Sequence, residues 1–455
     1  MLIFIQKLII IFICLTIRNV MSDNCMPIDD FDNAQLIITL TAKIDNNLTR
    51  KIGIYWYNKN FMSGDIVAIY DRNPVFNNSI PVFEYMPDIY SGNVITPLTL
   101  SFLNGNKIPV NKDICLKYYG AWIRNNRIRK TTCLSTHRNW MYEMKNSIGP
   151  YRLSEIILPG SHKSGLYIKN LPIWETPYEK YTVTQNQDIF TQLVHGVRFI
   201  DLSPDYFPEN SIEYWSNEGC SRNTPLLGIL MDIKLFLLAT KEIIVMNFRN
   251  FSEGFKNDDN HRNFKKFLEK EFKDYILYER PINPWNITLN EIWQSNKRLI
   301  ISFDHAVQSE NNSVWSLHIN YELEHKKSIE VIRKVIDEEY AAKYDQVLCR
   351  HEPCIREPRV IMAAVKSDYI PDCYGISNNI NASSYQDPRS AADIISPILL
   401  QIFNEQFFVN ANIIALNFVD ATGIVEFAIE WNKRRTSPCY DYYKSLMTPS
   451  TIFYV

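Results

Sequence analysis

A series of short apolar runs after residue 150 constrains the fold of this chain more than any other feature. The runs lack polar–apolar alternation and are rich in Ile and Val; they are EIILPG, GVRFIDL, IEYW, EIIVMNF, RLIISFD, RVIMAAV and NIIALNF. Such runs are typical of parallel strands that are buried on both faces. The segments between them have apolar residues that recur with a helical period, as in QDIFTQLVHG, NHRNFKKFLEKEF and SIEVIRKVIDEEY. This alternation predicts an α/β fold.

Repeated strand–helix units of this kind favour a (β/α) barrel, which we expect over residues 141–447. A doubly wound open sheet is the alternative. No glycine-rich dinucleotide-binding loop follows the first apolar run, so the barrel is preferred.

Residues 23–140 show a different pattern and predict a separate β-sandwich-like domain. β-rich segments are separated there by Asn, Gly and Pro turns; they are AQLIITLTAKI, RKIGIYWYN, GDIVAIYDRNP, PLTLSFLN and ICLKYYGAWIR. No recognisable catalytic cluster occurs in this region. A packing or adhesion role is therefore its simplest interpretation.

The N-terminal stretch MLIFIQKLIIIFICLTIRNVMS, residues 1–22, has the features of a signal peptide that is cleaved after Ser22. A membrane anchor is the alternative, but the apolar run from Leu8 to Ile17 is short for a bilayer. We therefore expect a secreted, extracellular protein. The formal net charge of −2 gives no indication of a nucleic-acid partner.

Cysteine use agrees with an oxidising compartment. Of the 9 cysteines, Cys14 lies in the signal peptide, and an even number remains, which favours disulfides. Plausible bridges join Cys115 with Cys133, and Cys349 with Cys354 or Cys373; the spacings do not resemble a zinc site. Glycosylation sequons compatible with secretion occur at Asn47, Asn77, Asn250, Asn286, Asn311 and Asn381.

Polar residues at the ends of the apolar runs are the candidates for a functional site, because the active site of a barrel lies where its strands end. In chain order they are His162, Asp201, Ser203, Glu218, Asn247, Asp304, His305, and Asn417 or Asp420. Imidazole and carboxylate groups are the usual acids and bases of catalysis. The pattern therefore predicts acid–base chemistry at one edge of the barrel.

Several segments, taken in order, resemble the X domain of phosphatidylinositol-specific phospholipase C (PI-PLC). They are EIILPGSHKSGLY, TVTQNQDIFTQLVHGVRFIDLSPDYFP, PLLGILMDIKLFLLATKEIIVMNFRNF and NIIALNFVDATGIVEFAIEWNKRR. The chain is most similar to the secreted X-domain-containing proteins of arthropods, which also carry an N-terminal β domain. The resemblance covers roughly residues 145–436. It implies a distorted TIM-like barrel and a phosphoric diester hydrolase.

The resemblance also implies roles for individual residues. In this family one His is the general base on the inositol 2-hydroxyl and a second His is the general acid, while a carboxylate orients the acid. An Arg, or calcium, neutralises the phosphate. His162 in PGSH matches the first His, and Asp201 in RFIDL matches the acidic residue of the second strand.

Other family positions are replaced in this chain. The matching residues are Glu218 for the second His, Ser203 for the Arg or calcium ligand, Asn247 and Asn417 for aspartates, and Lys163 for the residue after the first His. Loss of a general acid typically slows a reaction by about 10²–10⁴-fold, and loss of the cation weakens electrostatic stabilisation. No cofactor or metal is expected, since Lys163 would repel calcium.

These replacements leave three hypotheses. The preferred one is a catalytically degenerate protein that binds a phosphoinositide or inositol-phosphate-linked lipid, or a protein partner, with possible peripheral membrane contact. The second is an active, metal-independent phosphodiesterase with His162 as base, Lys163 as relocated cation and Glu218 or His305 as acid. In both, Ser203, Asn247 and Asn417 would contact the ligand. The third assigns the function to the N-terminal domain, with the barrel as a scaffold.

Overall fold

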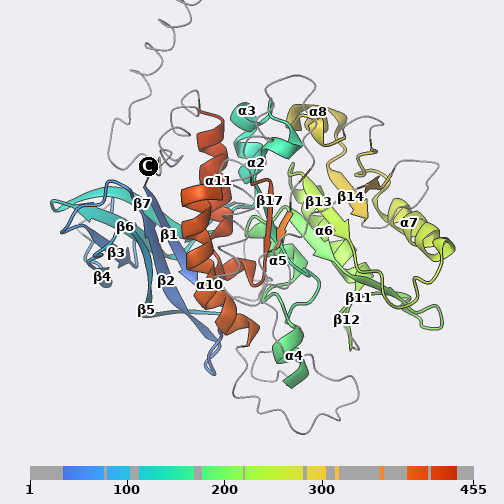
Figure 1. Ribbon diagram of the computed structural model, residues 1–455, viewed down its shortest axis with the longest axis horizontal. Helices are drawn as coiled ribbons and strands as arrows, with labels where there is room; N and C mark the ends of the chain where they lie inside the picture. The colour runs from blue at the N-terminus through green and yellow to red at the C-terminus, as the bar shows by residue number, and fades with distance from the viewer. Residues whose placement is uncertain are drawn as a thin grey trace, which may run out of the picture.

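The computed structural model shows an N-terminal part of antiparallel sheets beside an α/β part (Figure 1). The residues it describes are 34–75, 79–102, 112–168, 177–218, 221–279, 284–303, 313–316, 358, 360–362, 387–407 and 411–437. The predicted signal peptide lies outside these ranges, as do Cys349, Cys354, Cys373, Asp304, His305 and the sequons at Asn77, Asn311 and Asn381. Within the described ranges, no helix is both long and apolar enough to cross a membrane.

A 7-stranded parallel sheet forms the centre of the α/β part. In spatial order its strands are β15 (Trp315–Ser316), β14 (Leu299–Phe303), β13 (Ile244–Phe248), β9 (Phe199–Leu202), β8 (Leu158–Ser161), β17 (Ile413–Leu416) and β16 (Val360–Met362). Described residues of the longer strands are buried throughout, as the non-alternating runs predicted. Because all pairings are parallel, the carboxyl ends of the strands share one edge.

The predicted closed barrel is confirmed only as a parallel α/β sheet. Strands β15 and β16 form the two edges of this sheet, and the described residues contain no pairing between them. The apolar runs specify buried parallel strands, whereas closure also depends on the chain between these two edges.

Along the chain, helices precede and follow the strands of this sheet. They are α2 (Trp140–Glu143), α3 (Lys145–Ile148), α4 (Pro177–Thr182), α5 (Ile189–Val194), α6 (Leu226–Ala239), α7 (Asp258–Phe272), α8 (Leu289–Ser295), α10 (Pro388–Ile402) and α11 (Ile424–Arg435). Short polar side chains begin several of them: Asp188 accepts a hydrogen bond from the Thr191 amide, and Thr288 forms a capping box with Glu291. Helices α10 and α11 stand between the N-terminal sheets and the parallel sheet (Figure 1).

The prediction that IEYW forms a parallel strand of the barrel was wrong. This run contributes to β11 (Tyr214–Glu218), which pairs antiparallel with β10 (Pro204–Tyr206) and β12 (Ser221–Pro225) in a separate sheet. Ile212 is exposed and lies before β11, whereas Tyr214, the first residue of the strand, is buried. The run is thus not buried along its whole length, as a strand of a parallel sheet covered on both faces would be.

Two antiparallel sheets make up the N-terminal part. One contains β1 (Gln35–Leu40), β2 (Thr49–Tyr57) and β5 (Ser91–Ser101); the other contains β3 (Ile66–Tyr70), β4 (Phe83–Tyr85), β6 (Cys115–Arg124) and β7 (Arg127–Ser135). Side chains of both sheets share one hydrophobic core. The predicted Cys115–Cys133 disulfide is present and links β6 to β7. The sandwich arrangement and the domain boundaries stay predictions.

Candidate active site

The ends of β8 and β17 bring His162 and Asn417 together. These strands are neighbours, with Ser161 in register with Leu416, so the residue that follows each strand lies beside the other. His162 Nδ1 is 2.8 Å from Asn417 Oδ1, and the His162 side chain is buried. Because an amide oxygen only accepts hydrogen bonds, this contact places the ring proton on Nδ1. Nε2 is then the nitrogen that can accept a proton, as a general base must.

Asp201 forms a buried ion pair with Arg249 next to this histidine. Arg249 Nε lies 2.8 Å from Asp201 Oδ1, and Arg249 Nη2 lies 3.1 Å from Oδ2. The Lys163 amide also donates to Asp201, at 3.0 Å. Burial opposes ionisation, but the charge and hydrogen bonds of Arg249, together with His162, hold the pKa of the Asp201 carboxyl below its usual range. Asp201 is therefore a carboxylate that carries its own counter-ion.

Arg249 is a functional candidate that was not predicted from the sequence. It follows the last residue of β13. The register of β13 with β9 pairs Asn247 with Asp201, and the Arg249 side chain, two positions on, contacts the same carboxylate. The signal was available, since Arg249 comes two positions after Asn247 and so points to the same side of the strand. A cation at a strand end satisfies the same criterion as the other candidates.

Asn247 and Ser203 lie at the same edge of the sheet. Asn247 is fully buried: its amide nitrogen is 3.4 Å from Asp201 Oδ1, and its oxygen accepts a hydrogen bond from Ser302 at 3.0 Å. It therefore bridges β9 and β14. The Ser203 hydroxyl is buried and has no hydrogen-bond partner among the described residues. Buried hydroxyls normally have a partner, so an unmatched one at a strand end is a candidate ligand contact.

Lys163 is held at the site by its backbone. Its φ of 43° lies in the left-handed region, its amide donates to Asp201, and its carbonyl accepts from the Thr184 hydroxyl at 2.9 Å. These contacts fix the loop, while a role for the Lys163 ammonium as phosphate ligand stays a prediction. The side chain is half-buried.

Glu218 and Asp420 belong to other parts of the fold. Glu218 ends β11 in the antiparallel sheet, where its backbone pairs with Ser221, and its side chain is outside the described structure. Asp420 is in the 3-10 helix η7 (Val419–Ala421) and forms an ion pair with Arg50 of β2. Neither residue ends a strand of the parallel sheet. Asn217, next to Glu218, nevertheless donates its backbone N–H to the Ser203 carbonyl at 3.0 Å, and the acid role of Glu218 stays a prediction.

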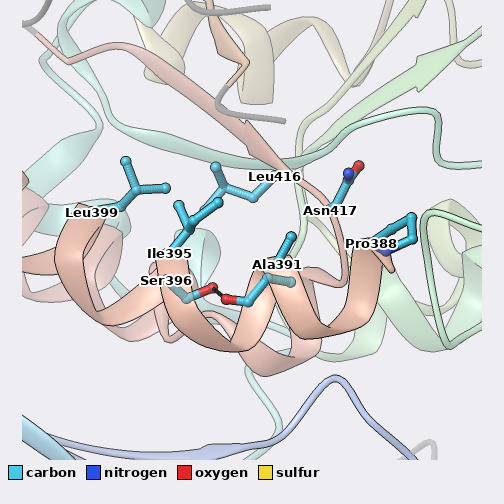
Figure 2. Close-up of a pocket in the computed structure, with 8 residues that line it drawn as sticks. Pro388, Ala391, Ile395, Ser396, Leu399, Leu416 and Asn417 are labelled. Atoms are coloured by element: carbon cyan, nitrogen blue, oxygen red, sulfur yellow. Dashed lines mark hydrogen bonds between the residues drawn. The ribbon is translucent and has the colours of Figure 1, made fainter. Parts of the chain in front are cut away.

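A pocket of about 290 Å³, including space open to solvent, adjoins Asn417. Figure 2 shows Leu416 above α10, near Ile395, and the amide of Asn417 pointing away from that helix; Ala391 and Ile395 of α10 line the same pocket. The lining is mostly apolar. Asn417 therefore borders both this pocket and the imidazole of His162. In the described ranges, no three His, Cys, Asp or Glu side chains are grouped as metal ligands would be.

The sequence relatives found among known proteins are named as phospholipases C, phosphatidylinositol phosphodiesterases or PI-PLC X-domain proteins. No family model matches the chain. A variant-surface-glycoprotein phospholipase C of Trypanosoma brucei brucei is 22% identical over 195 residues, covering 36% of this chain and 52% of that protein. A 1-phosphatidylinositol phosphodiesterase of Staphylococcus aureus is 31% identical over 145 residues, covering 31% and 41%. The human PI-PLC X domain-containing protein 1 is 25% identical over 214 residues, covering 42% and 64%.

These matches confirm the resemblance seen in the sequence: the chain is related to PI-PLC X-domain proteins. It spans between two fifths and two thirds of the length of these curated relatives. Among solved structures, two forms of the phosphatidylinositol-specific phospholipase C from Staphylococcus aureus align with TM-scores of 0.46 and 0.47 at 18% and 17% identity. Each alignment covers 65% of this chain and 97% of the other.

Proposed function

We propose that this relative of PI-PLC X-domain proteins binds the phosphodiester headgroup of an inositol lipid with little or no turnover. The observation that carries the proposal is the hydrogen bond between His162 and Asn417. A general base becomes a cation when it takes a proton, and a neutral amide stabilises that cation less than a carboxylate does. His162 is therefore positioned as a ligand contact but poorly equipped as a base.

The charges around His162 support binding of a monoanion. Arg249 and Asp201 neutralise each other, so an entering phosphodiester meets donors in a site of small net charge. The Ser203 hydroxyl adds a buried group at the same edge. The chemistry of the curated relatives, which are named as phospholipases or phosphodiesterases, agrees with a ligand of this class.

The replacement of the family's second His by Glu218 also supports binding without turnover. Cleavage of the ester needs a group that protonates the leaving oxygen. The other histidines with described positions lie elsewhere: His137 contacts Glu426, His261 contacts Phe251, and His195 follows α5. Secretion and contact with an extracellular membrane surface belong to this proposal on the strength of the sequence.

An active phosphodiesterase is the second candidate, and Arg249 is the observation that favours it. A guanidinium beside His162 could neutralise the charge that develops on phosphorus, as the relocated cation of this hypothesis requires. The cation would then be Arg249 in place of the predicted Lys163. Glu218 or His305 would have to supply the acid.

Calorimetric titration with glycerophosphoinositol, and turnover of a water-soluble inositol phosphodiester, test the proposal. The wild-type protein should bind the headgroup and release no product above background. R249K keeps the charge but loses the paired donor geometry, so it should weaken binding by about 10- to 100-fold. R262K, at the exposed Arg262 of α7, is the matched control and should bind normally.

Product formation that depends on His162 would overturn the proposal in favour of the active enzyme. A wild-type protein that binds no glycerophosphoinositol would overturn both candidates. N417D gives the imidazole an anionic partner, and we expect it to raise any residual turnover by about tenfold or more.

A further inference from the structure

An ion pair joins the N-terminal sheets to the segment that carries Asn417. Both terminal guanidinium nitrogens of Arg50, in β2, contact Asp420. Nη1 lies 2.5 Å from Oδ2, and Nη2 lies 3.3 Å from Oδ1. Both side chains are buried, with 2% and 5% exposed. Arg50 Nε also donates to the Thr41 carbonyl of its own sheet. Asp420 follows Asn417 by three residues, so the pair anchors the turn directly after the histidine's partner.

Phe418, between Asn417 and this ion pair, holds a backbone conformation that its own chemistry disfavours. Its φ of 48° and ψ of 52° are left-handed, which side chains with a Cβ rarely adopt. Such a conformation persists only where the surroundings enforce it. The Phe418 ring is fully buried in a cluster that includes Ala42, from the N-terminal part.

A chain of polar contacts supports Phe418 from the same side. The Arg389 guanidinium lies 5.2 Å from the Phe418 ring centroid and donates to Asn186 Oδ1 at 3.1 Å. Asn186 in turn donates to the Ala42 carbonyl at 3.1 Å. The backbone just beyond Asn417 is thus braced against the N-terminal part by packing as well as by charge.

Gln185 carries this restraint to His162. Its side-chain oxygen accepts from the Val419 amide at 3.1 Å. Its nitrogen donates to the carbonyls of His162 and Leu416, at 2.9 and 3.0 Å. One buried amide therefore ties together the histidine loop, the end of β17 and helix η7. A shift of η7 would move both members of the His162–Asn417 pair.

We propose that the N-terminal sheets hold the binding site in shape, with Arg50 as a positioning residue for the His162–Asn417 pair. Arg50 acts through Asp420 and η7 and does not touch the ligand. The role in ligand binding rests on the proposed function, whereas the effect on the His162 ring does not. The N-terminal part would thus fix the geometry of the candidate site in the α/β part.

The test compares two double variants that remove buried Arg–Asp pairs without leaving a lone charge. R50M/D420L removes the pair at η7. R124M/D65L removes the matched pair of Arg124 and Asp65, which is also buried and bidentate but lies wholly within the N-terminal sheets. Replacing both partners by apolar residues avoids the large penalty of an unpaired buried charge. R50K, which keeps the charge and loses the fork, is the milder variant if R50M/D420L does not fold.

The first readout is the ¹⁵N chemical shifts of the His162 ring, assigned by comparison with H162Q. The wild-type protein and R124M/D65L should show a single tautomer with the proton on Nδ1. R50M/D420L, or R50K, should show mixed tautomers. The second readout is the Kd for glycerophosphoinositol, which R50M/D420L should raise at least tenfold while R124M/D65L leaves it unchanged.

The proposal is overturned if R50M/D420L and R50K keep the wild-type ring shifts. It is also overturned if R124M/D65L alters the shifts equally, because the effect would then be a general loss of stability. Failure of the proposed function looks different. In that case the wild-type protein binds no glycerophosphoinositol, yet the His162 shifts still respond to the loss of Arg50.

Discussion

Two residues with side chains, Lys163 and Phe418, adopt left-handed backbone directly after His162 and Asn417. Each such conformation costs about 1–3 kcal/mol, which surrounding contacts must offset. Lys163 is held by hydrogen bonds to Asp201 and Thr184, and Phe418 by burial in its cluster. Strain on both sides of one hydrogen bond indicates that the geometry of this pair is set by the fold, and less by local sequence preference.

A carboxyl outside the site gives a direct prediction at this scale. Burial, and then the nearby charge of Asp188, raise the pKa of Asp232 to about 6 from 3.8. A raised pKa means that the protonated form stabilises the fold below about pH 4, and that this stability is lost as pH rises through about 6. D232N should therefore raise the free energy of unfolding by about 1–2 kcal/mol at pH 7.5, after allowance for partial solvent exposure.

Urea unfolding of D232N and wild type at pH 7.5 and pH 4 checks this prediction. The gain should shrink strongly at pH 4, where the wild-type carboxyl is protonated in the folded state. An equal gain at both values would mean that charge is not its source.

At the residue scale, the position of a residue at the end of a predicted strand indicated membership of the candidate site better than its residue type did. His162, Asp201, Asn247 and Asn417 follow or end parallel strands, and the structure brings them to one edge. Arg249 met the same positional criterion, but the strand-end candidates chosen from the sequence were His, Asp, Glu, Ser and Asn residues and did not include it. Whether two such groups bond depends on register between distant strands, which one sequence does not encode locally.

At the scale of elements, the lack of polar–apolar alternation in the sequence identified the buried parallel strands, with one exception. The run IEYW contains enough apolar residues for a core strand, but Ile212 is exposed and the run enters the central strand of a three-stranded antiparallel sheet. Its position between two genuine parallel strands suggested the wrong sheet. The parallel sheet, by contrast, was predictable because runs buried on both faces have few alternatives.

The turn between α5 and β9 gives a prediction at this scale. Gly196 has a φ of 111°, and a Cβ added there would lie 2.5 Å from Val425 Cγ1. G196A combines backbone strain with overpacking and should lower the free energy of unfolding by about 2–4 kcal/mol. The matched control is G228A in α6, where a Cβ meets nothing within 4 Å. It should be neutral or raise stability by about 0.5–1 kcal/mol, so equal losses in the two variants would refute the steric argument.

At the scale of the whole molecule, buried polar contacts join the N-terminal and α/β parts. Besides Arg50 and Asp420, Asn404 of the π-helix η6 (Phe403–Phe407) donates to Gln35 of β1 at 2.8 Å. Asp393 of α10 accepts from the Ala42 amide. Separating the two parts would exchange these hydrogen bonds for hydrogen bonds to water, and each such bond contributes about 0.5–1.5 kcal/mol net to stability. The sequence predicted two parts here but held no signal for how tightly they join.

This interface predicts that the two parts unfold together. Calorimetry should show one transition whose calorimetric and van't Hoff enthalpies agree. C115A/C133A opens a disulfide that closes a loop with a sequence separation of 18, so it should cost about 3 kcal/mol. Because folding is coupled, that loss should lower the whole transition, including the near-ultraviolet signal of Trp293 and Trp431 in the α/β part. Two transitions, with only the first shifted by C115A/C133A, would instead show that the N-terminal part folds alone, and Arg50 could then restrain η7 only while that part is folded.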